Sequence, residues 1–430
     1  MKTEFTSEQR EQPIIQIMED NLRKCVHCGF CLPVCPTYSI LGDERDSPRG
    51  RIYSIKNMLE KGGEPSHQTV KHVDRCLSCL ACMTACPSGV DYQHYIDYAR
   101  SYIDSSHRRS LIDKLFRWLI STVITNQRIF VVAITTARVF RPISKIFGKK
   151  INSLVNLVPR QITKKQISDH SVSFIVEGEA EIRVALLPGC AQRTLRPSIN
   201  EASIRLLNRM RATVIIPKNI NCCGAINYHL GAESTALMKA RSNIDVLINE
   251  IEGDGLDYII SNSAGCGTHI KDYFTIFQND PIYLEKSERI SKIARDITEV
   301  LSTLKIPNPE IFEGPLIIYH DACSLLHGQK IKNGPRELLK KFGFQIVEIP
   351  GNHFCCGSAG TYNLIQVNLA EKLKFERVSK INSIIKNQPI QFLVTGNIGC
   401  ITQMASEISI PTVHTVELLD WATGGPLPGS

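Results

Sequence analysis

The sequence has no apolar stretch that suggests a secretory signal or a membrane-spanning helix. Residues 1–21 mix acidic, basic and amide side chains and lack the apolar core of a signal peptide. The longest apolar candidate, 111–140, is interrupted by Asn126, Gln127 and Arg128. We therefore expect a protein that is made and kept in the reducing cytosol. In that compartment cysteines serve metal ligation or redox chemistry rather than a disulfide framework.

Other classes are excluded by composition. The 21 prolines and 27 glycines among 430 residues are too few for a disordered or fibrous chain. No glycine-rich dinucleotide fingerprint is present, since Gly265-Cys266-Gly267 is too short to count. With 43% hydrophobic and 21% charged residues, the chain is an ordinary globular protein with length for two to four domains.

What the sequence does contain is cysteine in a strict pattern. The 16 cysteines form four sets of four with none left over. The sets are Cys25, Cys28, Cys31, Cys35; Cys76, Cys79, Cys82, Cys86; Cys190, Cys222, Cys223, Cys266; and Cys323, Cys355, Cys356, Cys400. The last two sets repeat each other at offsets of 133, 133 and 134 residues, measured from Cys190, Cys222 and Cys266. An internal copy at a fixed period predicts a duplicated domain.

The first two sets both read C-x2-C-x2-C-x3-C-P, the bacterial ferredoxin motif. In this motif three close cysteines bind one cluster, and the fourth ligates the other cluster. The motif predicts two [4Fe-4S] clusters, with these ligands: Cys25, Cys28, Cys31 and Cys86 for the first, and Cys76, Cys79, Cys82 and Cys35 for the second. Zinc is the alternative, but it favours paired C-x2-C units, which two successive triplets fit poorly.

A long connection between the two motifs suggests that this ferredoxin module is mainly helical. Residues 52–59 are expected to be helical, with Ser47-Pro48-Arg49-Gly50-Arg51 as the capping turn before them. Arg49 and Arg51 either contact a partner or an acidic patch, or are solvated or internally paired.

The segment that follows is strongly basic. Residues 108–165 hold thirteen Lys or Arg and one acid, Asp113. Leu111, Leu115 and Trp118 are among the apolar residues that recur there at rough helical spacing. Such a segment suits an anionic membrane surface or an acidic partner subunit; the alternative is a pair of core helices with solvated outer faces. Nucleic acid is not expected as a partner, because no recognised binding motif is present.

The two C-terminal repeats alternate apolar strands with helices. In the first repeat strands are expected at 183–187, 212–216 and 257–261, and in the second at 315–319, 345–349 and 390–395, with helices between them. This βαβαβ order predicts parallel sheets. The cysteines follow the carboxyl ends of the strands, where open α/β sheets bind ligands.

Adjacent cysteines cannot point the same way along an extended chain. Gly224 and Gly357, which follow the Cys-Cys pairs, are expected to permit a turn that aims both sulfurs inward. Each repeat is predicted to hold a further iron–sulfur cluster; the alternatives are a thiol or vicinal-disulfide redox site and zinc. His269, His320 and His327 lie near these loops and are expected to be hydrogen-bonding neighbours rather than ligands.

A two-cluster ferredoxin followed by two Cys-Cys-Gly repeats resembles the CCG iron–sulfur protein family. Within it the chain resembles in particular the iron–sulfur subunits of bacterial glycolate oxidases, and the resemblance covers nearly the whole chain. The matching segments are Cys35-Pro-Thr-Tyr38, Ser47-Pro-Arg-Gly-Arg51, Leu187-Pro-Gly-Cys190 and Glu417-Leu-Leu-Asp-Trp421. Heterodisulfide reductase, anaerobic glycerol-3-phosphate dehydrogenase and lactate-utilisation proteins belong to the same family.

The resemblance implies an α+β multidomain protein. Its parts would be a helical ferredoxin domain at 1–107, a basic amphipathic linker at 108–180, and two α/β cysteine-rich (CCG) repeats with parallel sheets at 181–308 and 309–430. A final C-x2-C present in heterodisulfide reductase is missing, because Ser263 and Asn397 stand where it has a cysteine. That absence weighs against a five-thiolate cluster and against a disulfide reductase.

The resemblance also implies a role in an oxidoreductase complex. FAD-binding glycolate oxidase subunits would oxidise glycolate to glyoxylate, and this chain, with no flavin of its own, would pass the electrons towards membrane quinone. The same resemblance allows a glycerol-3-phosphate or lactate dehydrogenase partner, or a heterodisulfide-reductase-like enzyme. The expected location is the cytoplasm, with peripheral attachment to the inner face of the cell membrane.

Overall fold

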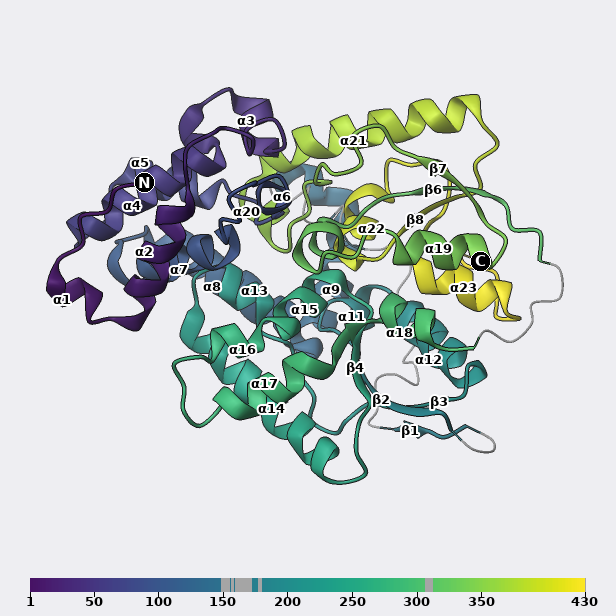
Figure 1. Ribbon diagram of the computed structural model, residues 1–430. Helices are drawn as coiled ribbons and strands as arrows, with labels where there is room; N and C mark the ends of the chain where they lie inside the picture. Colours follow the sequence, from purple (N-terminus) through teal and green to yellow (C-terminus); the bar gives the residue numbers. More distant parts are fainter. Residues whose placement is uncertain (148–154, 156–157, 159–171, 177–179, 306–311, 430) are drawn as a thin grey trace.

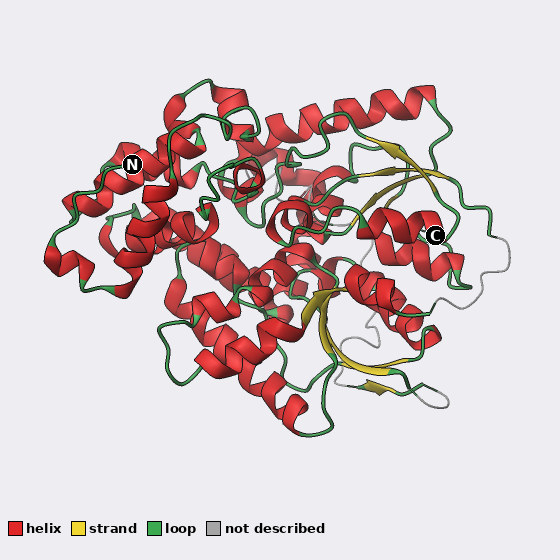
Figure 2. Ribbon diagram, in the orientation of Figure 1, coloured by secondary structure: helices red, strands yellow, loops and turns green. Residues whose placement is uncertain are grey.

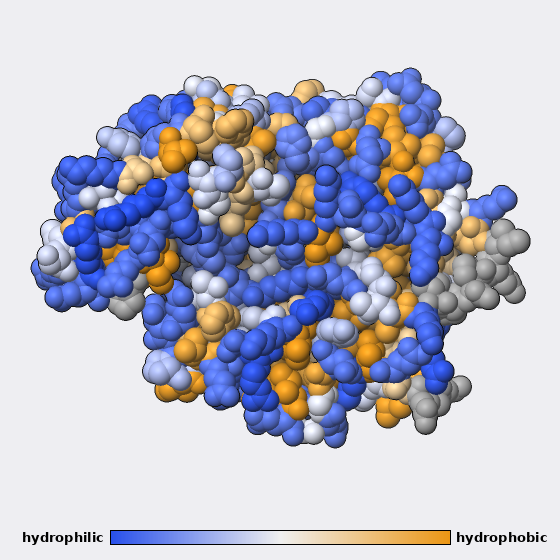
Figure 3. All heavy atoms as spheres, viewed as in Figure 1, coloured by the Kyte–Doolittle hydropathy of each residue, from blue (hydrophilic) through white to orange (hydrophobic). Residues whose placement is uncertain are grey.

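The computed structural model describes residues 1–147, 155, 158, 172–176, 180–305 and 312–429. An N-terminal helical region, a bent helix pair and two α/β repeats follow one another along the chain (Figure 1). The two sheets of the repeats are separate (Figure 2). Most of the face in Figure 3 is hydrophilic, with hydrophobic residues in separate patches.

The N-terminal region consists of short helices around one apolar core. Its helices are α1 (Ser7–Arg10), α2 (Pro13–Lys24), α3 (Pro36–Leu41), η1 (Glu44–Asp46), α4 (Pro48–Lys61), α5 (His67–Asp74), α6 (Ala81–Thr84) and α7 (Tyr92–Ser106). Met18, Ile55 and Ile96 are fully buried in this core. The expected capping turn is confirmed, because the Ser47 side chain accepts a hydrogen bond from the Gly50 backbone N–H at the start of α4.

The basic segment begins with two amphipathic helices, α8 (Leu111–Thr125) and α9 (Gln127–Phe140), followed by η2 (Arg141–Phe147). Asn126 separates the helices and caps α9, and their axes differ in direction by 106°. No single helix among the described residues is long and apolar enough to cross a membrane, whereas α8 and α9 taken together have the required length and composition. The basic residues at 149–150 and 160–165 lie outside the described residues.

The first repeat contains a five-stranded sheet in the order β1-β3-β2-β4-β5, in which only β1 is antiparallel. The strands are β1 (Ser173–Phe174), β2 (Ile182–Leu187), β3 (Ala212–Ile215), β4 (Tyr258–Ser261) and β5 (Ala294–Asp296). The helices are α11 (Gln192–Leu195), α12 (Ser198–Arg209), α13 (Ala225–His229), α14 (Glu233–Glu252), α15 (Ala264–Lys271), α16 (Tyr273–Ile276), α17 (Leu284–Ile293) and α18 (Ile297–Thr303).

The second repeat has a four-stranded parallel sheet in the order β7-β6-β8-β9. The strands are β6 (Leu316–Tyr319), β7 (Gln345–Glu348), β8 (Phe392–Thr395) and β9 (Thr412–His414). The helices are η4 (Ser324–Gly328), α19 (Gly334–Lys341), α20 (Tyr362–Ile365), α21 (Val367–Asn387), α22 (Ile398–Met404) and α23 (Thr415–Ala422). Its strand order matches β3-β2-β4-β5, so the predicted duplication extends to the topology. The predicted boundary between the repeats, 308 to 309, falls outside the described residues.

The two repeats pack against each other through one hydrophobic core, to which both sheets contribute. Helix α12 of the first repeat lies against α23 of the second. Across that contact Arg205 and Arg209 both pair with the buried Asp420. The two sheets are therefore fixed relative to each other, with their cysteine loops on a shared side.

The N-terminal region contacts both repeats. Helix α7 lies against the first repeat, where His94 pairs with Asp272 at 2.8 Å and His229 pairs with Asp97 at 3.2 Å. A small apolar cluster that includes Leu77 and Tyr362 joins the region to the second repeat. These contacts place the ferredoxin-like loops beside the loops of the repeats.

Candidate metal centres

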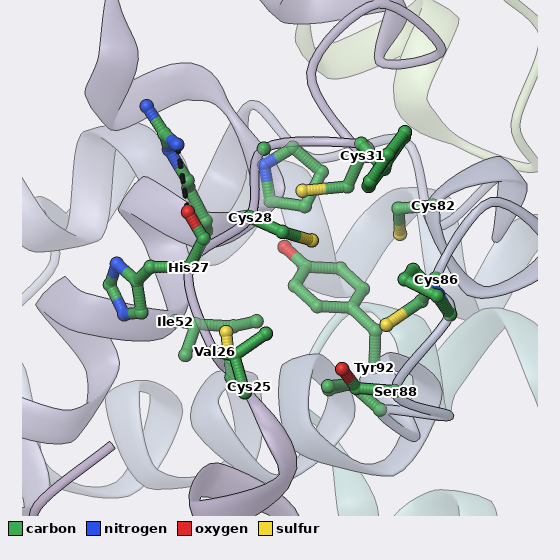
Figure 4. A pocket seen from close by; sticks show the side chains of 16 residues that line it. Cys25, Val26, His27, Cys28, Cys31, Ile52, Cys82, Cys86, Ser88 and Tyr92 are labelled. Carbon is green, nitrogen blue, oxygen red and sulfur yellow. Dashed lines mark hydrogen bonds between the residues drawn. The ribbon is translucent and has the colours of Figure 1, made fainter.

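Four cysteines from both ferredoxin motifs meet at the first candidate centre. Cys25, Cys28 and Cys31 lie on the loop after α2, and Cys86 follows α6. Figure 4 shows these side chains around one pocket, with Cys82 and the Tyr92 ring beside them. They are the four residues that the sequence predicts to share a cluster.

The second candidate centre has the complementary set. Cys76, Cys79 and Cys82 meet Cys35, which comes from the first motif. The Ser78 backbone N–H donates to Cys76 Sγ at 3.4 Å, and the Tyr92 hydroxyl donates to the same sulfur at 3.7 Å. Donors to sulfur of this kind stabilise thiolates and influence the reduction potential of a cluster.

Both loops adopt the same backbone. In the first, His27 and Gly29 have φ of +55° and +87°; in the second, Ser78 and Leu80, at the equivalent positions, have φ of +49° and +61°. Left-handed residues curl the chain back on itself, so that the three cysteines of a loop face a common point. For a leucine this conformation costs about 1 kcal/mol or more. The loop therefore keeps Leu80 left-handed, against the backbone preference of leucine, in the shape that brings its three cysteines together.

Arg51 is a buried cation beside the second centre. Its guanidinium donates to Thr37 Oγ1 at 2.9 Å and lies 3.9 Å from Cys35 Sγ and 3.4 Å from Asp46 Oδ1. Arg49 pairs with Glu44 at 2.5 Å and donates to the His27 carbonyl at 3.0 Å. Of the two alternatives for these arginines, internal pairing therefore describes both.

In each repeat the four cysteines form a short series of neighbouring sulfurs. In the second repeat Cys323 Sγ lies 3.8 Å from Cys355 Sγ. Cys355 also contacts Cys356, which contacts Cys400. The first repeat has the same series in the order Cys190, Cys222, Cys223, Cys266. None of the 16 cysteines, all of which lie in the described part of the chain, forms a disulfide.

The glycines after the Cys-Cys pairs have the predicted role. Gly224 and Gly357 have φ of +95° and +87°. A Cβ at either position would lie 2.8 Å from the Ala236 carbonyl oxygen or 2.6 Å from that of Ala370, on the equivalent helices α14 and α21. Glycine is therefore required at both turns for conformation and for close packing.

Both sulfur series line one cavity of about 490 Å³ between the repeats. Ser263 and Asn397, which occupy the two positions where the resemblance to heterodisulfide reductase would place a cysteine, meet at 3.5 Å and line this cavity. The Asn397 amide donates to Cys400 Sγ at 3.8 Å. A hydroxyl and an amide side chain, and not thiols, therefore line the cavity at these two positions.

The three histidines near the loops differ in their surroundings. His327 Nδ1 hydrogen-bonds to Thr84 Oγ1 at 2.8 Å, across the contact with the N-terminal region. His269 is buried among Tyr228, Tyr273 and His229, and burial lowers its pKa to about 3. His320 lies with Cys356 and Cys400, and the candidate ligand atoms of the three are within 4.8 Å of one another. The first two fit the predicted neighbour role.

The donor chemistry fits iron–sulfur clusters. Burial raises the pKa of Cys31 to about 11, and it raises the pKa of Cys82 well above that of a free thiol. In the first repeat, hydrogen bonds from the thiols of Cys190 and Cys223 lower the pKa of Cys222 well below its ordinary value. Buried thiols that are costly to ionise alone become thiolates when a cation replaces their protons, so loading and folding are coupled.

Comparisons with known proteins agree with this arrangement. Residues 21–90 match the 4Fe-4S dicluster domain, and residues 184–271 and 317–405 each match the cysteine-rich domain CCG. The glycolate oxidase iron-sulfur subunit of Escherichia coli (strain K12) is 36% identical over 424 residues, covering 98% of this chain and 99% of the relative. The chain belongs to the family of glycolate oxidase iron-sulfur subunits.

Other relatives within the wider family are more distant. The probable glycolate oxidase iron-sulfur subunit of Bacillus subtilis (strain 168) is 28% identical, with 99% of both chains covered. Lactate utilization protein A of Bacillus licheniformis is 23% identical over 246 residues, covering 56% of this chain and 99% of the relative. Membership confirms that the chain is an iron–sulfur electron-transfer subunit of an oxidoreductase, with two ferredoxin-type [4Fe-4S] clusters.

Two features of the centres were not predicted from the sequence. The first is the burial of Arg51 with Asp46 and Thr37; the sequence left internal pairing of this arginine as one of two alternatives and named no partner for it. The second is the approach of His320 to Cys356 and Cys400. Its position three residues before Cys323, where the first repeat has Leu187, is a signal that an alignment of the two repeats reveals.

Proposed function

We propose that this chain accepts electrons from an FAD-binding partner that oxidises glycolate to glyoxylate, and passes them towards membrane quinone. The observation that carries the proposal is the succession of cysteine sets through the protein. Cys79 of the second ferredoxin centre and Cys323 of the second repeat pack against the same small apolar cluster. The sulfur series of the second repeat then shares the central cavity with that of the first.

The proposed ligands follow the geometry. Cys25, Cys28, Cys31 and Cys86 would hold one [4Fe-4S] cluster, and Cys35, Cys76, Cys79 and Cys82 the other. The two sulfur series of the repeats would hold further centres. The backbone turns at these loops and the N–H donors to sulfur support this assignment.

The partner's substrate is tested with the reconstituted complex. We expect that glycolate, added anaerobically to this chain and its co-purified flavoprotein, produces the paramagnetic signals of reduced clusters. L-lactate and glycerol 3-phosphate serve as controls and are expected to produce none. Reduction by either of them but not by glycolate would replace the proposed partner with the corresponding dehydrogenase, and thiol release from a heterodisulfide would replace it with a disulfide reductase.

We also propose that the outer face of α8 and α9 attaches the protein to the inner face of the cell membrane. Leu111, Ile112, Trp118, Val132 and Val139 on this face are each at least 60% exposed. Lys114 and Arg128 are exposed beside them, and the segment is basic, as an anionic bilayer requires. A buried inner face and an apolar outer face on the same helices are typical of interfacial insertion.

Vesicle binding tests this attachment. The double variant Trp118→Ser, Val132→Ser is expected to bind vesicles containing anionic phospholipid at least tenfold more weakly, because two exposed apolar side chains are lost. The control is Phe375→Ser, because this phenylalanine is 68% exposed but belongs to α21 and not to the basic segment. Equal binding by the double variant and the control would contradict the proposal.

A further inference from the structure

The cavity between the repeats has two chemically different groups of lining residues. The repeats contribute all eight of their cysteines and several amides, here called the polar end, whereas α8 and α9 contribute apolar side chains from their inner faces, here called the apolar end. The apolar residues at that end include Phe116, Ile120, Ile124, Phe130, Ala133 and Ala137. Nine apolar side chains of the helix pair line the cavity, and none of them can act as a metal ligand. We therefore expect an additional, apolar ligand at this end.

The same two helices have the exposed apolar face described above. A ligand dissolved in the bilayer would therefore meet the outer face of the pair first, and the cavity lies directly behind it. Ile120 and Ile134 point inward and are 6% and 3% exposed, whereas Trp118 and Val132 on the other face are 60% and 65% exposed. The helix pair thus has one apolar face on the surface of the protein and the other on the cavity that the cysteines line.

The polar end offers hydrogen-bond acceptors. Gln192 is 1% exposed, lines the cavity, and donates through Nε2 to Asn200 and Asn262, while its Oε1 has no partner among the described residues. Asn363 Oδ1, also at the cavity, has none either. Buried acceptors without donors favour a ligand that brings hydroxyl groups.

From these observations we infer that the cavity is the binding site of an isoprenoid quinone, with its ring towards the cysteine end and its tail along α8 and α9. This inference rests on the proposed function. Reduction to the quinol takes two electrons, which reach this chain from the two-electron oxidation of the partner's 2-hydroxy acid, and two protons from solvent. The two hydroxyl groups formed are the donors that Gln192 and Asn363 lack.

The binding site is tested with 2-heptyl-4-hydroxyquinoline N-oxide, a fluorescent quinol analogue, in the absence of membranes. Ala137→Trp fills the apolar end and is expected to weaken binding at least tenfold. The matched control is Thr136→Trp, at the exposed neighbouring position of α9, which is expected to bind within twofold of the wild type. Equal binding by the two variants, with equal iron content, would overturn the assignment.

Photolabelling of the wild-type complex tests the same site without a variant that could misfold. An azido-quinone is expected to label peptides from 116–137 and 358–366, and decylubiquinone is expected to prevent this labelling. Labelling confined to other peptides would place the quinone elsewhere. Glycolate-dependent reduction of a water-soluble dye reports the proposed electron transfer separately: if the dye is reduced and the analogue does not bind, only the quinone site is wrong.

A second inference follows independently from the environment of His320. Its side chain is 1% exposed, its Nδ1 has no hydrogen-bond partner among the described residues, and a ring nitrogen lies within 4.8 Å of the sulfurs of Cys356 and Cys400. The equivalent residue of the first repeat is Leu187, which offers no ligand atom. The geometry assigns His320 as a nitrogen ligand of the metal centre in the second repeat, where the fifth cysteine is replaced by Asn397.

Electron–nuclear double resonance on protein labelled with ¹⁵N-histidine tests this assignment without a measurement of activity. We expect a directly bonded histidine nitrogen in the reduced wild type, its loss in His320→Leu, and its retention in the control His269→Asn of the first repeat. The absence of a histidine coupling in the wild type, or its persistence in His320→Leu, would show that the centre has sulfur ligands only.

Discussion

The N-terminal region and the C-terminal repeats both contain a duplicated cysteine pattern, but they differ in how the two copies contribute cysteines to each centre. In the N-terminal region each centre takes three cysteines from one motif and the fourth from the other. In the repeats each sulfur series comes from a single repeat. Interleaved motifs make two centres depend on each other, whereas self-contained repeats allow each centre to diverge.

The two C-terminal repeats differ in the residues beside their cysteines. The second repeat has His320 and Asn397 where the first has Leu187 and Ser263. The second repeat also lies beside the ferredoxin centre that includes Cys79, whereas the first is joined to α7 by polar pairs. The two repeats therefore differ both in the side chains beside their cysteines and in how they contact the N-terminal region, although both line the cavity.

The largest expected effect comes from breaking the interleaving. Cys35→Ser is expected to reduce the N-terminal iron from about eight per chain to about four or fewer, because its loop supplies ligands to both clusters. Cys400→Ser is the matched control, since it removes a ligand from a self-contained series. In Cys400→Ser the paramagnetic signals of the N-terminal clusters should remain those of the wild type. Their loss would refute the distinction between interleaved centres in the N-terminal region and self-contained centres in the repeats.

A smaller effect is expected from the turns that the two repeats share. Gly224→Ala should lower the free energy of unfolding by about 2 to 3 kcal/mol, because the residue is left-handed and its new Cβ meets the Ala236 carbonyl oxygen. Gly255→Ala is the control. Gly255 follows the C-terminus of α14 and also has a positive φ of +78°, but no neighbouring atom lies within 4 Å of the new Cβ. That change should cost about 1 kcal/mol. Denaturant unfolding measures both, and equal losses would deny the steric role of the Cys-Cys-Gly turn.

Much of this architecture was predictable from the sequence, since the inner strands are apolar and each motif fixes its own spacing. The edge strands β1, β5 and β9 were not predicted, because two or three residues carry no alternating pattern. The buried arginine beside Cys35 was not predicted either: the ion pair that stabilises Arg51 joins residues whose spacing has no helical or strand period. The juxtaposition of Cys79 and Cys323 depends on the packing of whole domains, which no local pattern encodes.

The smallest expected effect concerns the polar contact between α7 and the first repeat. Burial alone would lower the pKa of His94, but its hydrogen bonds to Asp272 and Asp91 raise that pKa to about 10. The charged histidine therefore stabilises the folded protein most below about pH 6.5, and this contribution is lost as the pH rises towards 10. Thermal melting between pH 7 and pH 10 should show a decline that is weaker in His94→Gln. Identical declines would mean that the pair contributes nothing to docking.

The central claim is that the cysteines of this chain hold iron and sulfide and thereby conduct electrons. Iron and acid-labile sulfide, measured on the anaerobically purified chain, test it most directly. We expect about eight of each per chain from the two ferredoxin centres, and more if the repeats are loaded. An iron-free preparation that still supports full turnover in the reconstituted complex would contradict the account.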